Sequence, residues 1–320
     1  MSSTAELPGM DVILHLGAHR TGSTTFQCYM RGADARLAGQ GIGFWGPRRT
    51  RDGLLHDLIV PSARRGAAQR ATGRLRLART TSERRGLQAL VISDENVIGT
   101  MRACLRRRRL YPEAGPRGAR LAAGLRPVRR AVLSIRSPEY WWASALAHLL
   151  GRGVPVPEAR LIDEILAPER SWRQVVAEVA RALPEAELIV VPAERFAPRP
   201  DALLRIATQA QAVPMLPPGG IRANRSPDLP ALRALLTELG EHPAQLPPGE
   251  GRWMPFTPAQ AAQLRERYAD DLFWLRAGAN GLARLEEDPE PLTDRLTWPP
   301  VLKERGRDDD SQEGRLAQTR

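Results

Sequence analysis

Short apolar runs alternate with longer mixed or polar segments along most of this chain. Four such runs lie at 12–16, 88–92, 131–135 and 188–191, and each is followed by polar residues. Short apolar runs of this kind are typical of strands buried in a parallel sheet. A further extended piece is predicted at 41–45. Because parallel strands present ligand-binding groups at their carboxyl ends, we expect a functional site where these runs end.

Helices are predicted between and after the strands. The first opens near Thr21 and runs to about Leu37, and the arginine-rich segment 62–85 is expected to form one long helix or two shorter ones. A late helix begins with Thr257 as N-cap and Pro258 at its first position. We therefore expect one domain over 1–302, with an α/β core at 11–225 and a mostly helical extension at 226–302. The polar segment 303–320 is expected to be disordered.

The segment DVILHLGAHRTGSTTFQCYM, at 11–30, combines a strand, a loop between glycines and the start of a helix. Hydroxyl groups and unpaired backbone amides at a helix start favour an anion such as phosphate. In the loop that binds nucleoside triphosphates, G-x-x-x-x-G-K-[ST], a lysine follows the second glycine. Gly17 and Gly22 fit this spacing, but Ser23 occupies the lysine position. The basic side chain is instead Arg20, inside the loop.

A second candidate anion site follows the apolar run at 131–135. Arg136 comes directly after the run, Pro138 can start a helix because its missing N–H costs nothing there, and Ser144 lies two turns on. Arg136 can offer a planar fork of donors to a phosphate. Since the helix brings Ser144 back within reach of the same group, we expect Arg136 and Ser144 to bind one anion together.

These two motifs resemble those of sulfotransferases that use 3′-phosphoadenosine 5′-phosphosulfate as sulfuryl donor. The family's 5′-phosphosulfate loop is close to H-x-G-x-x-K-T-G-T-T, and this chain has HLGAHRTGSTT, with Arg20 for the lysine and Ser23 for a threonine. The family's 3′-phosphate motif is R-x-P followed by a serine two helical turns after the arginine, which here corresponds to Arg136 and Ser144. The polar end of the run at 88–92, with Glu95, is similar to the strand-end S-x-E of bacterial sulfotransferases. The resemblance covers roughly 11–280.

The resemblance implies a three-layer α/β/α fold like that of P-loop nucleotide hydrolases, with a mostly parallel sheet and a helical C-terminal extension. It implies an enzyme that transfers a sulfuryl group to an acceptor hydroxyl on a carbohydrate or glycolipid, without a metal. We expect a cytoplasmic protein, because the first residues lack a basic segment followed by an apolar run and no stretch could span a membrane. A late basic loop with Arg222, Asn224 and Arg225 would cover the 3′-phosphate. The donor would be held by residues of both motifs, namely Arg20, Thr21, Gly22, Ser23, Thr24, Thr25, Arg136 and Ser144.

The residues that would carry the chemistry follow from the charges that develop during transfer. A fixed cation lowers the barrier by stabilising negative charge on the leaving phosphate oxygen and on the sulfuryl oxygens, and Arg20 would fill this role. The acceptor hydroxyl must also lose its proton, and the candidate bases are His56 and Glu95. We favour His56 because an imidazole has a suitable pKa near neutrality, whereas a glutamate would need desolvation.

Two other functions stay open on sequence grounds. Asp94 and Glu95, at the end of an apolar run, resemble the magnesium-binding and water-activating carboxylates of a P-loop kinase or nucleotide hydrolase. The absence of a lysine after Gly22 removes the main phosphate contact of that class. The second alternative is a non-catalytic module that binds an anionic glycan or nucleic acid through its arginines.

Composition narrows the choice of partners only slightly. The net charge of +11 and the pI near 10.9 favour anionic partners, with binding that weakens as salt rises. Almost all of this positive charge is arginine, since Lys303 is the only lysine, and we therefore give the basicity little weight. We expect no specific nucleic acid partner. The two cysteines, Cys28 and Cys104, have no metal-ligand spacing, and no apolar stretch is long enough to span a membrane.

Overall fold

A parallel sheet of six strands forms the centre of the protein. The computed structural model describes residues 9–61, 64–217, 220, 221, 223 and 225–288. Across the sheet the strands follow the order β2-β3-β1-β4-β5-β6, and each neighbouring pair is parallel. The predicted α/β class with a mostly parallel sheet is thus confirmed. The strands are β1 (Asp11–His15), β2 (Ile42–Trp45), β3 (Ala89–Ser93), β4 (Arg130–Ile135), β5 (Glu187–Pro192) and β6 (Arg284–Leu285).

Helices cover both faces of this sheet and continue beyond its end. On the first half of the chain they are α1 (Ser23–Gly32), α2 (Asp34–Gly39), α3 (Pro47–Arg49), α4 (His56–Ile59), α5 (Ala67–Arg84), α6 (Met101–Arg107) and α7 (Ala114–Leu125). On the second half they are α8 (Pro138–Leu150), α9 (Ala159–Leu166), α10 (Trp172–Ala182), α11 (Ala193–Phe196), α12 (Pro200–Thr208), α13 (Leu229–Glu238) and α14 (Pro258–Arg276).

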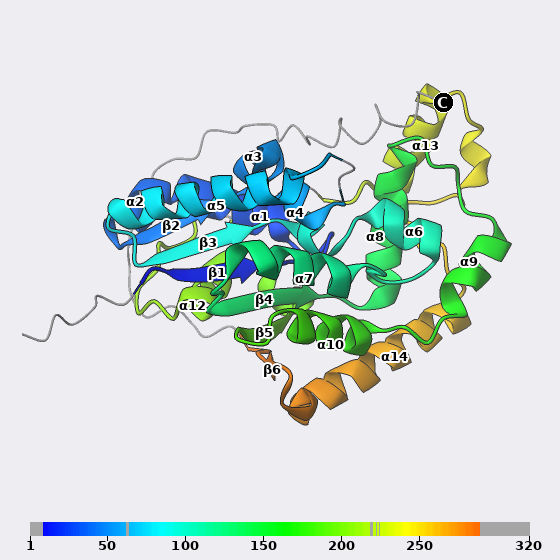
Figure 1. Ribbon diagram of the computed structural model, residues 1–320. Helices are drawn as coiled ribbons and strands as arrows, with labels where there is room; N and C mark the ends of the chain where they lie inside the picture. The colour runs from blue at the N-terminus through cyan, green and yellow to red at the C-terminus, as the bar shows by residue number, and fades with distance from the viewer. Residues whose placement is uncertain (1–8, 62–63, 218–219, 222, 224, 289–320) are drawn as a thin grey trace, which may run out of the picture.

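The alternation of side chains along each strand produces two hydrophobic cores. In β1, Val12 and Leu14 pack into one core, and Ile13 packs into the other. Helices α5, α7 and α10 cover the first face of the sheet, whereas α1 and α12 cover the opposite face (Figure 1). Because both faces are covered, the strands are apolar on both sides, which explains the continuous apolar runs in the sequence. The result is the expected three-layer α/β/α arrangement.

The first helix is shorter than the sequence predicted. It was expected to run to about Leu37, but α1 ends at Gly32 and a separate helix, α2, begins at Asp34. Glycine is a weak helix former, so the chain can turn at this point at little cost. The turn lets Leu37 pack fully buried in the core shared by α1 and α12.

Helix α14 attaches the C-terminal extension to the core through a buried carboxylate. Asp271, on α14, accepts hydrogen bonds from the backbone amides of Trp172 at 2.9 Å and Arg173 at 3.2 Å. These amides open α10 and have no acceptor further along that helix, so Asp271 satisfies them together with the N-cap residue Ser171. The short strand β6, beside β5, was not predicted because two residues carry no periodic pattern. The predicted tail 303–320 lies outside the described residues.

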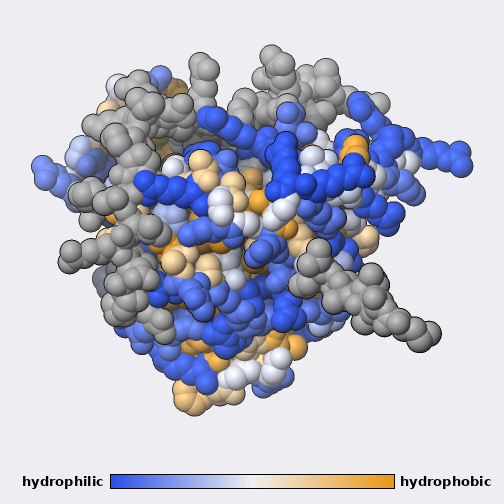
Figure 2. All heavy atoms as spheres, turned by 90° about the vertical axis from the view of Figure 1, so that its left-hand side faces the viewer, coloured by the Kyte–Doolittle hydropathy of each residue, from blue (hydrophilic) through white to orange (hydrophobic). Residues whose placement is uncertain are grey.

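Charged and polar residues dominate the surface. Hydrophilic residues cover most of the face seen in Figure 2, with hydrophobic residues between them near its middle. The large hydrophobic side chains that are exposed in the described part lie on separate segments, at Leu77, Tyr140, Leu239 and Phe273. Among the described helices, none is both long and apolar enough to cross a membrane.

Candidate functional site

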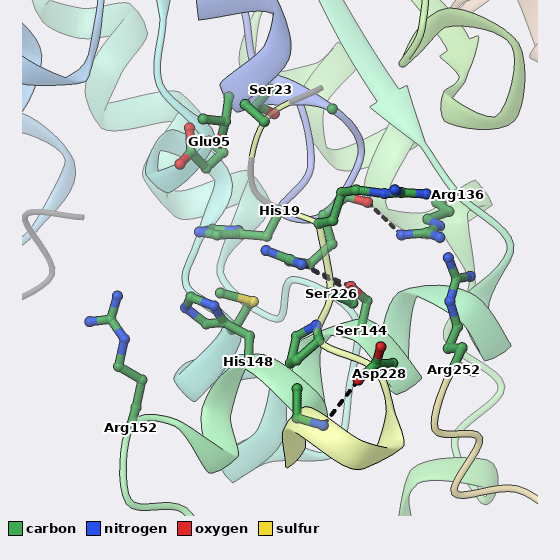
Figure 3. Close-up of a pocket in the computed structure, with 18 of the residues that line it drawn as sticks. His19, Ser23, Glu95, Arg136, Ser144, His148, Arg152, Ser226, Asp228 and Arg252 are labelled. Atoms are coloured by element: carbon green, nitrogen blue, oxygen red, sulfur yellow. Dashed lines mark hydrogen bonds between the residues drawn. The ribbon is translucent and has the colours of Figure 1, made fainter. Parts of the chain in front are cut away.

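A cavity of about 640 Å³ opens at the carboxyl edge of the sheet, where β1, β3 and β4 end. Its walls come from the loop after β1, from the short helical turn η2 (Glu95–Ile98), from α8 and from the segment 225–231 (Figure 3). This is the edge at which open parallel sheets bind ligands. Its volume falls within the usual range for small-molecule sites.

The loop after β1 needs glycine at both of the positions that the sequence analysis marked. A Cβ on Gly22 would lie 2.7 Å from the Cβ of Ala197, and Gly22 has a φ of +93°, in the left-handed region that disfavours side chains. A Cβ on Gly17 would lie 2.5 Å from the Oγ of Ser23 and 2.8 Å from the ring of His15. The two glycines therefore allow the backbone to fold tightly in front of α1.

The residues predicted to hold the 5′-phosphosulfate divide into those that line the cavity and those that are buried behind it. Arg20, Gly22, Ser23 and Thr24 line the cavity. The side chains of Thr21 and Thr25 are buried and do not line it. The Thr21 hydroxyl donates to the carbonyl oxygen of Ala18, and the Thr25 hydroxyl accepts from the amide of Ala223 at 3.5 Å. Thr21 thus stabilises the loop itself, and Thr25 contacts the segment around Ala223. Their hydroxyl groups do not face the cavity, where a ligand would bind.

The start of α1 faces the cavity with a positive end. Ser23 and Thr24, its first residues, line the cavity, and its first turn contains no acidic side chain. The first amides of a helix have no acceptor within the helix, and the helix dipole adds partial positive charge at this end. The geometry of the loop therefore favours an anion.

The two predicted anion motifs meet in the structure. The Nε of Arg20 donates to the Oγ of Ser144 at 2.8 Å, although the two residues lie on different elements, far apart in the chain. A second nitrogen of Arg20, Nη2, donates to the Oγ of Ser226 at 3.0 Å. Arg136 donates through Nη1 to the carbonyl oxygen of Arg20 at 2.8 Å. The loop after β1 and the start of α8 therefore form one continuous site.

Arg136 occupies a fixed position at one side of this site. Its carbonyl oxygen accepts from the Nε1 of Trp172 at 2.7 Å, which fixes the end of β4. Burial and then the nearby positive charge of Arg252 lower the pKa of Arg136. Both guanidinium groups lie over the ring of Tyr140, at 6.0 Å for Arg136 and 5.3 Å for Arg252. Two arginines held close together in this way form a ready site for a phosphate.

Positive charge outweighs negative charge along the cavity walls. Asp228 and Glu95 are the carboxylates that line the cavity in the described part of the chain, and Asp228 caps α13 by accepting from the amide of Ala231 at 3.0 Å. Arg222 and Asn224, predicted in the covering loop, lie outside the described residues, whereas Arg225 lines the cavity. The arginines that line it are Arg20, Arg51, Arg136, Arg152, Arg225 and Arg252.

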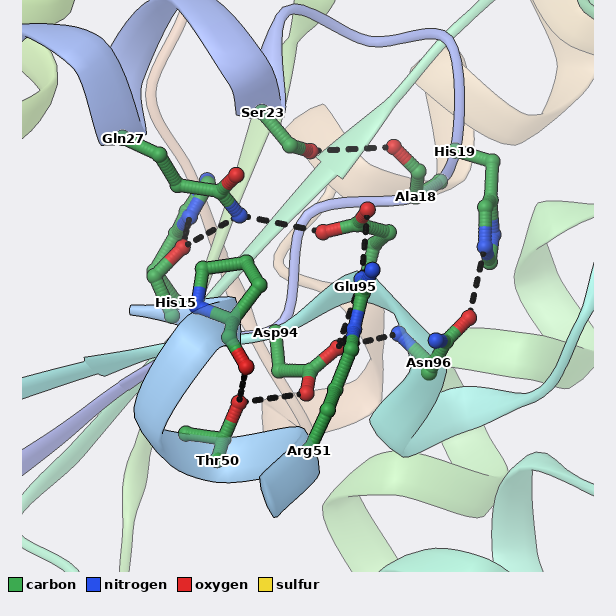
Figure 4. A network of polar contacts seen from close by, with 12 residues as sticks. His15, Ala18, His19, Ser23, Gln27, Thr50, Arg51, Asp94, Glu95 and Asn96 are labelled. Carbon is green, nitrogen blue, oxygen red and sulfur yellow. Dashed lines mark hydrogen bonds and ion pairs between the residues drawn. The ribbon is translucent and has the colours of Figure 1, made fainter. Parts of the chain in front are cut away.

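Arg51 binds both carboxylates at the end of β3. Its Nη2 lies 3.1 Å from Oδ1 of Asp94 and 2.8 Å from Oε1 of Glu95, and the Thr50 hydroxyl donates to Asp94 at 2.6 Å (Figure 4). Burial opposes the ionisation of Glu95, but the charges of Arg51 and His19 outweigh burial and lower its pKa to about 2. A carboxylate with so low a pKa is a weak base.

The same ion pairs weaken the magnesium alternative. Asp94 and Glu95 are both bound to Arg51, so their oxygens are already engaged by a cation. In the part of the chain that the structure describes, no group of three or more His, Cys, Asp or Glu side chains is placed to hold a metal ion. Magnesium binding by these two carboxylates would therefore require that their contacts with Arg51 be broken.

His15 lies beneath the loop and connects it to the same network. Its Nδ1 lies 2.8 Å from the hydroxyl of Ser93, which also accepts from Gln27 at 3.2 Å, and Gln27 donates to Glu95 at 3.0 Å. Burial lowers the pKa of His15 to about 4, against the opposing charge of Glu95. His15 is therefore neutral at pH 7 and serves as packing for the loop.

We expect this buried histidine to make the protein less stable in mild acid. In the unfolded chain this histidine has an ordinary pKa of about 6.5 and is protonated at pH 5, whereas in the folded chain it stays mostly neutral. The free energy of unfolding should therefore fall by about 2 kcal/mol from pH 7 to pH 5. The ionised form of Glu95 also stabilises the folded chain, but because its pKa is lowered, that stabilisation is lost mainly below pH 5. Chemical denaturation at pH 7 and pH 5 measures the change in the free energy of unfolding. His15→Asn should make this change smaller, whereas His242→Asn should leave it as in wild type. An equal slope for wild type and His15→Asn would contradict this prediction.

His56, the favoured base in the sequence analysis, is not brought to the cavity. It begins α4, its side chain is 61% exposed, and its Nδ1 lies 3.5 Å from Oδ1 of Asp57. Neither His56 nor Asp57 lines the cavity. The suitable pKa of an imidazole was a poor guide here, because it says nothing of where the side chain lies, and α4 packs against α5 and α7.

Sequence reasoning missed several polar residues that line the cavity, namely His19, Arg51, His148, Arg152, Ser226, Asp228 and Arg252. Two of them carried a usable signal, since His19 lies inside the loop motif and His148 follows Ser144 by one helical turn. Ser226 and Arg252 carried none, because they reach the site from the C-terminal part only through the tertiary fold. Comparisons with protein-family models, with curated proteins and with solved structures found no match to this chain.

Proposed function

We propose that this protein is a cytoplasmic sulfotransferase that takes its sulfuryl group from 3′-phosphoadenosine 5′-phosphosulfate. The acceptor would be a hydroxyl on a carbohydrate or glycolipid. One observation carries the proposal: the side chain of Arg20, from the first anion motif, donates to Ser144 of the second at 2.8 Å. A nucleotide with phosphate groups at both its 3′ and 5′ positions needs two adjacent anion sites, whereas a nucleoside triphosphate needs one.

The residues present fit such a donor. The start of α1, with Ser23 and Thr24, and the guanidinium of Arg20 would hold the 5′-phosphosulfate. Arg136, Ser144 and Arg252 would hold the 3′-phosphate, and the strong excess of arginine around the cavity offsets the donor's negative charge. The cavity volume of about 640 Å³ is in the range of small-molecule sites.

Arg20 would assist the transfer. The donor supplies a sulfuryl group joined to a phosphate oxygen, on which negative charge builds as the bond to sulfur breaks. A cation already fixed in place stabilises that charge without having to reorganise. The contacts of Arg20 with Ser144 and Ser226 fix its plane. An arginine fork can therefore replace the lysine that the family loop usually carries, provided that its geometry is maintained.

Calorimetric titration with nucleotides tests the donor assignment. Adenosine 3′,5′-bisphosphate, the donor without its sulfuryl group, should bind at least tenfold more tightly than adenosine 5′-monophosphate, because only the former reaches Arg136. Raised salt should weaken its binding, as expected for a site with many arginines. Tighter binding of ATP with magnesium than of the bisphosphate would refute the assignment. Binding of the bisphosphate without any transfer of labelled sulfuryl would instead indicate a non-catalytic module.

A further inference from the structure

We propose that His148 is the catalytic base that takes the proton from the acceptor hydroxyl. This inference rests on the proposed sulfuryl transfer and adds to it the residue that activates the acceptor. None of the residues predicted from the sequence fills this role in the structure, because Glu95 is bound to Arg51 and His56 lies outside the cavity.

The position of His148 follows from α8. It lies four residues after Ser144, so both side chains project from the same face of the helix, and both line the cavity. Ser144 contacts Arg20, the cation proposed to stabilise the leaving phosphate. His148 therefore stands one helical turn from the contact that joins the two anion motifs.

The distribution of charge separates a donor side of the cavity from an acceptor side. Arg136 and Arg252 lie on one side, Arg152 lies on the opposite side, and Ser144 and His148 lie between them (Figure 3). If the donor occupies the side with Arg136 and Arg252, the acceptor must approach from the side with Arg152. His148 is then the ionisable side chain at the boundary between the two substrates.

Other ionisable groups of the cavity are less suited to this role. Glu95 is ion-paired with Arg51, and its pKa is lowered to about 2. His19 is 8% exposed, and its ring nitrogens lie 2.9 Å from the hydroxyl of Tyr111 and 3.0 Å from Oδ1 of Asn96. Asp228 caps α13, and a carboxylate is in general a weaker base than an imidazole.

The remaining histidines lie elsewhere. His15 is buried under the loop and bonded to Ser93, and it does not line the cavity. His56 is exposed on α4. His242 is exposed beyond α13, where its Nδ1 accepts from the amide of Ala244 at 3.2 Å. The chain contains five histidines, so His148 is the one that combines access to the cavity with a position between the two motifs.

The proposed step balances as follows. The acceptor oxygen forms a bond to sulfur, and the bond between sulfur and the phosphate oxygen breaks, leaving its electron pair on that oxygen. The acceptor proton moves to the imidazole of His148. The products are a sulfate ester, adenosine 3′,5′-bisphosphate and protonated His148, which returns its proton to water.

Loss of the base should reduce turnover while the nucleotide still binds. The full-length protein would be incubated with donor labelled with ³⁵S, in water alone and with a panel of mono- and disaccharides, and inorganic sulfate and sulfated sugars would be measured. His148→Ala should lower the rate of donor consumption at least about a hundredfold, the usual contribution of a general base. Its affinity for adenosine 3′,5′-bisphosphate should stay within about twofold of wild type, since the phosphate sites keep their arginines.

Two comparisons distinguish a catalytic role from a structural one. Added imidazole should restore part of the rate to His148→Ala, because it can enter the space left by the side chain and accept the proton. The control His242→Ala should keep the wild-type rate. Full activity of His148→Ala, or a loss that imidazole does not rescue, would overturn the inference. Wild-type protein that binds the bisphosphate but consumes no donor would also overturn it, whereas failure to bind the bisphosphate would refute the proposed function itself.

Discussion

Arg136→Ala should weaken the binding of adenosine 3′,5′-bisphosphate by at least about thirtyfold. Truncating one partner of a buried, hydrogen-bonded charge pair costs on the order of 2 kcal/mol or more, and Arg136 would be that partner for the 3′-phosphate. The side chain also donates to the carbonyl oxygen of Arg20 at 2.8 Å, so its loss should loosen the loop as well. Calorimetry with the bisphosphate measures the effect directly.

A matched control separates this local effect from the loss of one positive charge. Arg84 is exposed at the end of α5, outside the cavity. Arg84→Ala removes one positive charge, as Arg136→Ala does. It should change the affinity by less than about twofold, because exposed charges at a distance are screened by salt. Binding of adenosine 5′-monophosphate should be less sensitive to Arg136→Ala than binding of the bisphosphate. Equal losses for Arg84→Ala and Arg136→Ala would remove Arg136 from the site.

Arg20→Asn should lower the rate of sulfuryl transfer by about a hundredfold to a thousandfold. Removing one preorganised group that stabilises developing negative charge typically has an effect of this size. Arg20 has a φ of +63°, in the left-handed region. A residue other than glycine adopts this backbone conformation at a cost of about 1 kcal/mol. Asparagine tolerates this conformation better than most residues. The replacement therefore removes the charge without adding backbone strain, and transfer from ³⁵S-labelled donor measures the loss.

The lysine variant tests whether charge or geometry matters at this position. Arg20→Lys keeps the positive charge but replaces the planar fork by a single ammonium group, which cannot donate to Ser144 and Ser226 in the same way. We expect it to retain more activity than Arg20→Asn, since the family loop usually has lysine there. Thermal unfolding of both variants should stay close to that of wild type. Equal rates for wild type and Arg20→Asn would show that Arg20 does not stabilise the leaving group.

Much of the fold could be read from the sequence because its signals are local. The apolar runs that became β1, β3, β4 and β5 are continuous, since both faces of the sheet are covered. The loop between Gly17 and Gly22 was also recognisable, because a tight turn before a helix restricts residue type at fixed spacing. The break between α1 and α2 was not foreseen, since a periodic apolar pattern continues across it.

The site was predictable only in part. The sequence identified Arg20, Ser23, Arg136 and Ser144, which line the cavity, because they belong to motifs at strand ends. It could not show that Thr21 turns inward to Ala18, since neighbouring hydroxyls in a loop are equivalent until the backbone fixes their directions. The choice between possible bases depends on burial and on neighbouring charge, which are properties of the assembled fold.

The sequence by itself thus determined the parallel α/β core of this protein and the places of two candidate anion-binding motifs at strand ends, because strand burial and helix starts depend on neighbours in the chain. Only the tertiary structure decided that these motifs touch through Arg20 and Ser144, that Arg51 neutralises Glu95, and that His148 rather than His56 reaches the cavity. These relations join residues far apart in the chain. The packing of α8 and of η2 against the loop after β1 sets them, and no local pattern encodes that packing.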